Sequence, residues 1–335
     1  MDSNCEGCGA VMAEATLSCL QCGWLAHSDE LKRLAADADA AESAGDLSAA
    51  LSSWRRALDL LPPETRQHAA ILDKIRGLSG RVDRGETPKP KGALAGGTAG
   101  LGALALLLWK FKFILALVLT KGKLLLLGLT KAPTFLSMFA FFGVYWSIFG
   151  WQFALGFVLA IYVHEMGHVY QLSRFGISAT APMFIPFVGA FVRLNQYPAT
   201  AREDSRVGLA GPIWGLGAAA AAWLLYLATG AGMLGAIAKM AAFINIFNLI
   251  PVWQLDGARG FRSMNRTQRG LALAASGGAW FLTSQVYLLI VALVGIFRLF
   301  ERDQPREPDH VALVQWIVLI AGLGALCTIH VPLPR

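Results

Sequence analysis

The sequence WQFALGFVLAIYVHEMGHVYQL, residues 151–172, is an apolar run of membrane-spanning length that ends in ionisable side chains. Residues 153–163 are all apolar or small, so the segment is expected to be a helix buried in a bilayer. An ionisable group there costs about 2.5–3.5 kcal/mol on insertion scales. Three such groups follow within five positions: His164, Glu165 and His168. A bound metal ion would compensate for their burial directly.

His164 and His168 are four residues apart, so on a helix both imidazoles face the same side and are close enough to bind one ion. Glu165 lies one position round the helix and remains free to act on a metal-bound water. This is the HExxH pattern of zinc hydrolases, in which the metal lowers the pKa of its water and the glutamate accepts the proton. The alternative, a pair of core histidines without a metal, leaves their burial uncompensated.

The composition predicts an all-α polytopic membrane protein. Of 335 residues, 55% are hydrophobic and only 15% are charged, with a mean hydropathy of +0.51, which is too apolar for a soluble protein of this size. The net charge of +7 is spread over the N-terminal segment and the membrane-flanking loops, so the expected partner is the lipid bilayer, and no nucleic acid is expected. About six spans are predicted, near residues 133–149, 151–172, 207–229, 232–250, 277–298 and 310–330.

Four of the five cysteines lie in two CxxC pairs at the N-terminus. These pairs are Cys5-Glu-Gly-Cys8 and Cys19-Leu-Gln-Cys22. Each is followed by a glycine, Gly9 or Gly23, which lets the backbone turn tightly beneath the sulfurs of a zinc ribbon. No basic and apolar signal peptide precedes them, so residues 1–27 are expected in the cytosol, where metal binding is favoured over disulfides. The pattern predicts a structural zinc site.

Residues 28–80 carry alanine, leucine and charged residues at helical spacing, which predicts two or three amphipathic helices. The stretch 41–62 resembles a tetratricopeptide repeat, but one unit only is visible and solenoids normally need several. Two interpretations stay open: a helical hairpin that packs on the ribbon, or a groove that binds a cytosolic protein partner through residues 1–80. Residues 81–100 are rich in proline and glycine and are predicted to be a linker.

Two apolar segments are poor candidates for spanning helices. Residues 101–132 contain four interrupting lysines, and a span would place two of them near the bilayer centre, so an interfacial or re-entrant segment is predicted. Residues 177–193 combine β-branched and aromatic residues with two prolines. A re-entrant loop or short hairpin beside the metal site is expected there, with an edge able to accept a substrate strand. A plain connecting loop is the alternative.

Three polar stretches separate the later spans. Residues 202–206 are expected to form a polar loop before the span at 207–229. Four arginines within residues 259–269 predict a basic cytosolic loop facing anionic headgroups. The mixed-charge stretch 298–309 is expected on the opposite side of the membrane.

A second informative stretch is NIFNLIPVWQLDG, residues 245–257. Pro251 is expected to end or kink a helix, and Asp256 is then an acidic group at the same end as His164. A catalytic zinc with two histidines lacks a third protein ligand, and its fourth position is left for water. Asn245 and Asn248 are candidates for oxyanion or substrate contacts, although capping and packing explain them equally well.

Three motifs in this order resemble the site-2 protease family of intramembrane zinc metalloproteases. They are HEMGH on a membrane helix, Gly211-Pro212 in a later helix, and NLIPVWQLDG after it. The resemblance covers about residues 130–270. It departs from the family in Ile213-Trp214-Gly215, where some members carry an asparagine, and in the lack of a PDZ-like insertion. Substrate selection is therefore expected to depend on the N-terminal ribbon and helices.

The resemblance implies that residues 133–335 form an intramembrane metalloprotease domain. It implies zinc ligation by His164, His168 and Asp256, with Glu165 as the catalytic base. We therefore expect an enzyme with one catalytic and one structural Zn²⁺ that hydrolyses peptide bonds within or next to the transmembrane segments of membrane proteins. Two alternatives remain: a non-catalytic membrane adaptor with structural zinc sites and a cytosolic partner-binding domain, and a zinc hydrolase of non-peptide bonds. The intact Glu165 argues against the adaptor.

Overall fold

A computed structural model describes residues 3–13, 16–86, 132–180, 182–186, 189–191, 194, 196–301 and 304–331. All but the last residue of the predicted segment 101–132 and most of the predicted linker 81–100 therefore lie outside the described residues. The chain divides into two compact units, which are described separately. Unit 1 comprises Met1–Lys91, Leu172–Ala179 and Leu194–Glu203, and unit 2 comprises Gly92–Gln171, Thr180–Arg193 and Asp204–Arg335.

The ribbon of unit 1 is built from two similar turns. The first turn is closed by the short antiparallel pair β1 (Ser3–Asn4) and β2 (Val11–Met12), and the second by a bridge between Ser18 and Leu25. Gly9 and Gly23 both have a φ of +75°, the left-handed conformation that glycine adopts without strain. The sequence expectation for these two glycines is confirmed.

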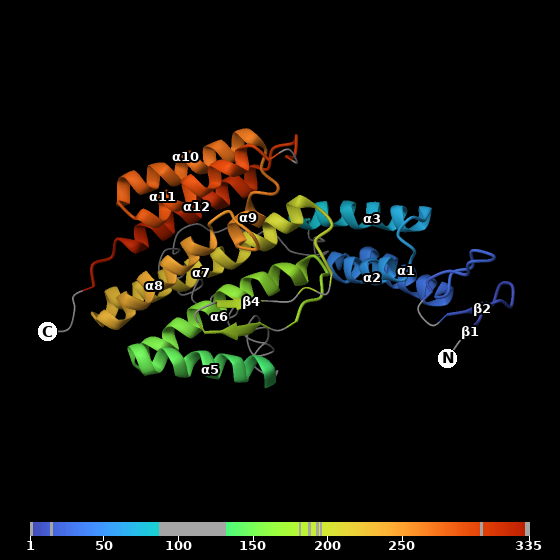
Figure 1. Cartoon of the computed structure of the whole chain (residues 1–335), viewed down its shortest axis with the longest axis horizontal. Coiled ribbons are helices and arrows are strands. Elements are labelled where there is room, and N and C mark those ends of the chain that lie inside the picture. The colour runs from blue at the N-terminus through green and yellow to red at the C-terminus, as the bar shows by residue number, and fades with distance from the viewer. Residues whose placement is uncertain are drawn as a thin grey trace, which may run out of the picture. The chain divides into compact units, whose positions relative to one another are not determined.

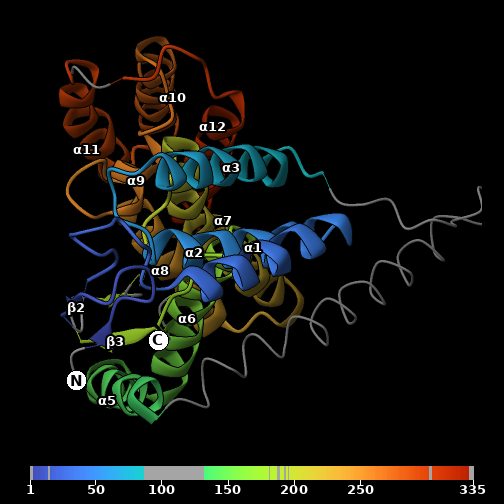
Figure 2. The same cartoon turned by 90° about the vertical axis from the view of Figure 1, so that its right-hand side faces the viewer.

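Three helices follow in unit 1: α1 (Ser28–Ser43), α2 (Leu47–Asp59) and α3 (Arg66–Asp83). Each of the last two begins at a capping side chain, since Asp46 accepts a hydrogen bond from the Ala49 N–H and Thr65 accepts one from the His68 N–H. The helices α1 and α3 both pack on α2 (Figure 2), and their apolar faces meet in a buried core. The prediction of two or three amphipathic helices is confirmed.

Unit 2 contains the apolar helices. They include α5 (Ala132–Phe149), α6 (Trp151–Arg174, to Gln171 in this unit), α7 (Ala201–Thr229, from Asp204), α8 (Gly232–Asn248) and α12 (His310–Cys327). Among the described residues, α6, α7 and α12 are long and apolar enough to cross a membrane, and residues 134–149, 232–248 and 286–299 form shorter apolar helices. This agrees with the predicted all-α membrane protein.

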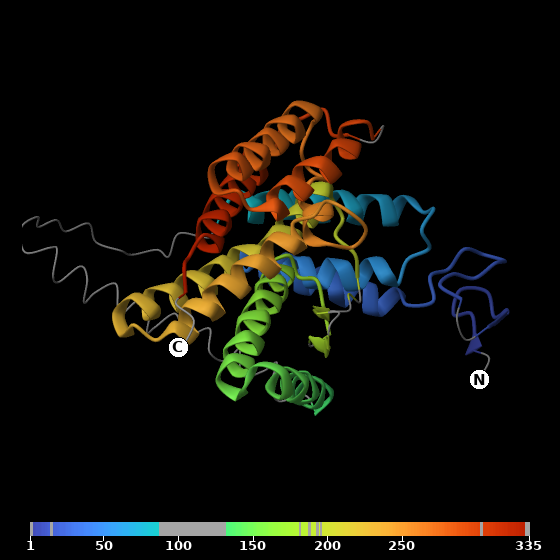
Figure 3. The same cartoon turned by 60° about the vertical axis from the view of Figure 1, so that its left-hand side comes forward.

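The helices α5 and α6, which match the predicted spans at 133–149 and 151–172, form a hairpin. Gly150 joins them with a φ of +84°, a conformation that a β-carbon would disfavour. Figure 3 shows the two green helices meeting at a sharp turn. Their contact is rich in aromatic rings, among them Phe141 and Phe157 with centroids 6.2 Å apart.

The predicted single span at 277–298 is wrong. The chain forms α10 (Arg266–Thr283), then turns, and continues as α11 (Val286–Gly295) and a 3₁₀ turn (Ile296–Leu299). Ser284 ends α10 with a φ of +55°. The helices α10, α11 and α12 then lie together (Figure 1), with the indole of Trp316 fully buried among them.

The expectation that residues 298–309 lie opposite the basic stretch 259–269 is also wrong. The buried Arg269 donates a hydrogen bond to Glu301, with 2.9 Å between Nη1 and Oε2. It also donates to the carbonyl oxygen of Arg298. The physical reason is the turn at Ser284, since α11 returns the chain to the end where α10 begins.

Residues 202–206 are not a loop but belong to the first turns of α7, and several of their side chains are buried. Within unit 2, Asp204 accepts from Arg259 and Arg262 at 2.8 Å each, and Arg206 forms a two-bond ion pair with Asp309 at 2.8 and 3.0 Å. Buried charges are retained where such partners exist. Arg259 and Arg262 are therefore engaged in intramolecular ion pairs.

A short hairpin follows α6, as the sequence expectation for residues 177–193 allowed. The strands β3 (Met183–Ile185) and β4 (Gly189–Phe191) pair antiparallel, with Met183 opposite Phe191. An isolated bridge between Ala179 and Leu194 pairs the residues that flank the hairpin. The alternative of a plain connecting loop is excluded.

Candidate metal centres

Three potential ligand atoms converge inside unit 2. The Nε2 atoms of His164 and His168 are 3.1 Å apart. One carboxylate oxygen of Asp256 lies 3.1 Å from His164 Nε2, and the other lies 3.2 Å from His168 Nε2. All three residues are buried. The four-residue spacing on α6 produces the histidine pair, and the short helix α9 (Asp256–Gly260) supplies the carboxylate from its first position.

The outer nitrogens of both imidazoles are held by oxygen acceptors. His164 Nδ1 lies 2.8 Å from Asn245 Oδ1, and His168 Nδ1 lies 2.8 Å from the carbonyl oxygen of Val207. Because these oxygens only accept, each Nδ1 carries the proton and each Nε2 presents a lone pair. Two lone pairs and a carboxylate that face one another at this distance favour a cation between them.

The triangle fits a divalent metal ion. Zinc binds imidazole nitrogen and carboxylate oxygen at about 2.0–2.2 Å, so neighbouring ligands in a tetrahedron lie about 3.3–3.5 Å apart. The observed separations of 3.1–3.2 Å are close to this and need only a small expansion. The Asp256 carboxylate faces both Nε2 atoms and can serve as the third ligand.

Two glycines allow the backbone to approach the cluster closely. A β-carbon on Gly211 of α7 would lie 2.2 Å from His168 Nε2 and 2.8 Å from His164 Nε2. A β-carbon on Gly257, the residue after Asp256, would lie 2.0 Å from the carbonyl oxygen of Leu249. The glycines of the Gly-Pro and Leu-Asp-Gly motifs thus serve to bring α7 against the histidines and to seat α9 beneath the end of α8.

A cavity of about 290 Å³ adjoins the cluster. His164, Glu165 and Asn248 are its polar lining residues, and Ala190 of β4 also borders it. Its remaining wall is apolar and largely aromatic: Phe141, Tyr145, Ile161, Phe243, Ile244, Phe247 and Leu255. Glu165 is buried and lines the same cavity as His164, so its carboxylate is a candidate general base.

The two asparagine candidates have different positions. Asn248 Nδ2 lies 3.4 Å from His164 Nε2, so its amide borders the cavity and the cluster. Asn245 lies behind His164, with Oδ1 on the imidazole and Nδ2 donating to the Ala241 carbonyl oxygen at 2.7 Å. The sequence offered no signal for the other imidazole partner, since it is the backbone carbonyl of Val207.

The four N-terminal cysteines form a separate cluster in unit 1. Their sulfurs lie within 4.8 Å of one another, with 3.6 Å between Cys5 and Cys22 and 3.7 Å between Cys8 and Cys19. A disulfide needs about 2.05 Å, whereas four sulfurs about 2.3 Å from a tetrahedral zinc lie about 3.8 Å apart. The cluster fits a zinc ribbon.

Fold and sites together define a helical membrane protein with two candidate metal centres. Residues 152–239 match the model of peptidase family M50. The match includes HEMGH and Gly211-Pro212 and ends before the stretch that carries Asp256. A search among curated proteins found no match. The resemblance to site-2 proteases is confirmed over the matched residues, and it supports a membrane-embedded metallopeptidase.

Proposed function

We propose that this protein is an intramembrane zinc metallopeptidase that hydrolyses peptide bonds within or next to the transmembrane segments of membrane proteins. The observation that carries the proposal is the convergence of His164 Nε2, His168 Nε2 and the Asp256 carboxylate at 3.1–3.2 Å. The match of residues 152–239 to peptidase family M50 supports it. A buried glutamate in the adjoining cavity distinguishes this site from a purely structural one.

Each residue of the site has a proposed role. His164, His168 and Asp256 hold a zinc ion, which when bound supplies Lewis acidity and a water of lowered pKa. Glu165 accepts the proton of the attacking water and delivers it to the nitrogen of the leaving amine. Asn248 donates an N–H to the carbonyl oxygen of the scissile bond, because its amide borders both His164 and the cavity.

The substrate must be locally extended at the scissile bond, because the carbonyls of an intact helix are hydrogen-bonded within the helix. The edge formed by β3 and β4 is the proposed place where an unwound substrate pairs, since Ala190 of β4 borders the cavity. Helix-weakening residues such as glycine near the cleaved bond should therefore speed cleavage.

The organisation of the rest of the chain follows the sequence interpretation. We retain the zinc ribbon at 1–27, the helical segment at 28–80 and the protease domain at 133–335, with the N-terminal segment in the cytosol. Five of the six predicted spans are kept, and the helical hairpin of α10 and α11 replaces the predicted span at 277–298. The four cysteines hold a structural zinc, and the ribbon is the proposed surface for a cytosolic partner.

The decisive experiment compares wild-type protein with Glu165→Gln in detergent or liposomes. The probes are two single-span reporter proteins, one with glycines in its span and one with only alanine and leucine. Wild type should cleave the glycine-containing reporter faster, and Glu165→Gln should abolish cleavage while both zinc ions remain bound. Equal cleavage of the two reporters would remove the unwinding requirement.

The adaptor alternative makes a different prediction for the same variant. In an adaptor, Glu165→Gln changes neither zinc content nor partner binding, and wild type cleaves neither reporter. If purified wild type holds zinc at the histidine cluster but cleaves no reporter under any condition, the protease proposal fails.

A further inference from the structure

Arg55 of α2 is a buried cation that bonds two segments from the middle of the chain, and all these residues belong to unit 1. Its guanidinium is only 4% exposed and forms a two-bond ion pair with Glu203, at 2.9 and 3.0 Å. Its Nε donates to the Phe175 carbonyl oxygen at 3.0 Å, and its Nη1 donates to the Tyr197 carbonyl oxygen at 3.4 Å. One side chain thus joins Leu172–Ala179 to Leu194–Glu203.

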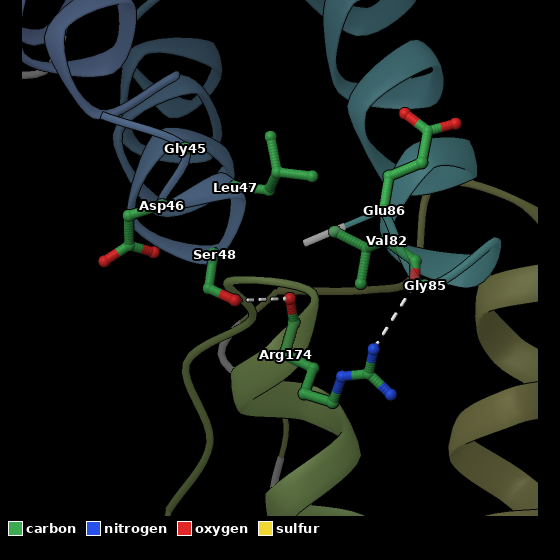
Figure 4. A pocket seen from close by; sticks show the side chains of 8 residues that line it. All are labelled: Gly45, Asp46, Leu47, Ser48, Val82, Gly85, Glu86 and Arg174. Carbon is green, nitrogen blue, oxygen red and sulfur yellow. Dashed lines mark hydrogen bonds between the residues drawn. The ribbon is translucent and has the colours of Figure 1, made fainter. Parts of the chain in front are cut away.

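Further contacts between the N-terminal helices and the first of these segments support the same arrangement. Ser48 donates to the Arg174 carbonyl oxygen at 2.9 Å, and the Arg174 guanidinium donates to the Val82 carbonyl oxygen at 3.3 Å (Figure 4). Gly176 has a φ of +64°, and a β-carbon there would lie 2.5 Å from the Ser52 nitrogen. The backbone of this segment therefore lies directly on α2.

The ion pair is specific in geometry. Glu203 is 1% exposed and also accepts from the Ala199 N–H at 2.6 Å, so its carboxylate closes the turn that precedes α7. The Arg55 guanidinium forms two parallel bonds to the carboxylate and donates to two carbonyl oxygens as well. Lysine has a single ammonium group, so it would lose some of these hydrogen bonds. Removal of either partner would leave the other buried and uncompensated.

The two joined segments flank the β3–β4 hairpin in the chain. Leu172–Ala179 follows the HEMGH sequence along α6, and Leu194–Glu203 leads into α7. The bridge between Ala179 and Leu194 pairs their hairpin-proximal ends. Arg55 and this bridge therefore hold both ends of residues 180–193, which include the strand whose Ala190 borders the cavity.

We propose that the helices at 28–83 form an intramolecular clamp in which Arg55 is a positioning residue for the base of the β3–β4 hairpin. The face of α2 that carries Arg55 contacts Leu172–Ala179 and Leu194–Glu203 of the same chain, so a peptide from another protein is not its partner. The consequence for cleavage rests on the proposed function. When the two ends of the hairpin are held in place, its edge is positioned to pair with a substrate strand. Loss of the clamp should therefore weaken substrate binding.

The first test needs no proteolytic activity. A cleavage site for a sequence-specific protease is inserted between residues 87 and 88 of the full chain, and the purified protein is cut. The N-terminal fragment should stay bound to the remainder in wild type and in Arg56→Glu, an exposed neighbour on α2. It should be released by Arg55→Glu and retained more weakly than in wild type by Arg55→Lys, which keeps the positive charge but not the two-bond geometry. Equal retention in every variant, or release from wild type, would overturn the clamp.

The second test measures cleavage of the glycine-containing reporter. Arg55→Glu should raise KM by about tenfold or more with a smaller effect on kcat, since small misplacements of a binding element cost up to a hundredfold. Arg55→Lys should raise KM by less, and zinc content should not change in either variant. If Arg55→Glu does not fold, Arg55→Lys gives the milder form of both tests. If the wild-type protein has no proteolytic activity, the proposed function is refuted. The first test, which measures retention of the N-terminal fragment, then decides whether the clamp exists.

Discussion

Asn245 Oδ1 lies 2.8 Å from His164 Nδ1, and this amide is itself fixed because its Nδ2 donates to the Ala241 carbonyl oxygen at 2.7 Å. The second bond determines which end of the amide faces the imidazole. The first then fixes the tautomer of His164 and the direction of its Nε2. Such outer partners of metal ligands commonly affect metal affinity by 10- to 100-fold.

Asn245→Leu should therefore lower zinc affinity at the histidine cluster by about 10- to 100-fold, because the imidazole loses the acceptor that orients it. Competition with a zinc chelator measures the effect. Asn245→Asp keeps an oxygen at Nδ1 and should retain most of the affinity. Asn248→Ala is the contrasting variant, with zinc affinity near wild type but slow cleavage. Unchanged affinity in Asn245→Leu would remove this residue from the site.

Gly211→Ala should expel the metal, since its β-carbon would lie 2.2 Å from His168 Nε2. We expect a loss of at least about tenfold in zinc affinity, comparable to the loss of an orienting contact. Gly217→Ala on the same helix is the matched control, because a β-carbon there meets no atom within 4 Å. Zinc titration of both variants decides the question, and equal zinc binding would show that α7 does not lie against the cluster.

The sequence predicts the histidine pair directly from helical spacing, but it predicts the contact with the distant Asp256 only indirectly. Helical periodicity alone brings His164 and His168 onto one face, because their spacing is a property of one helix. Asp256 was assigned from its position after Pro251 and from the family resemblance, since periodicity says nothing about contacts between distant segments. Prolines and β-branched residues at 177–193 argue against a spanning helix and predict a re-entrant loop or a short hairpin, and the structure shows the hairpin.

The errors have two physical causes. An apolar run gives no sign of a turn when the turning residue is not glycine or proline, as with Ser284. A polar stretch before a span, such as residues 202–206, is predicted to be a loop when the side chains that form ion pairs with it are not known. Glu203 and Asp204 are buried within a helix because Arg55 and Arg259 reach them from distant parts of the chain.

Two zinc ions per chain are expected in purified protein, one in each cluster. Cys8→Ser should remove one, because a structural site needs all four thiolates, and the histidine cluster should keep its own. Cys327→Ser is the control, since this buried cysteine lies in α12 and outside the sulfur cluster. Metal analysis by mass spectrometry counts the ions. Retention of two zinc ions in Cys8→Ser would contradict the ribbon site.

The Arg206–Asp309 ion pair predicts a dependence of stability on pH. Asp309 lies just before α12, and its carboxylate caps that helix through the Ala312 N–H. Burial raises the pKa of Asp309, but the Arg206 guanidinium outweighs burial and holds the pKa below its usual value. The stabilisation is therefore fully present above the unfolded value of about 3.9 and is lost as pH falls through the lower folded value.

Asp309→Asn keeps a capping side chain but removes the charge-assisted bonds to the buried Arg206, so at pH 7 it should lower the free energy of unfolding by about 3 kcal/mol. The difference from wild type should shrink as pH falls below about 4, because protonated Asp309 then resembles asparagine. Asp73→Asn, which breaks an exposed ion pair with Arg76, should cost less than about 1 kcal/mol at any pH. Thermal unfolding in detergent across this pH range tests all three proteins. A pH-independent difference for Asp309→Asn would mean that the carboxylate charge does not stabilise the fold.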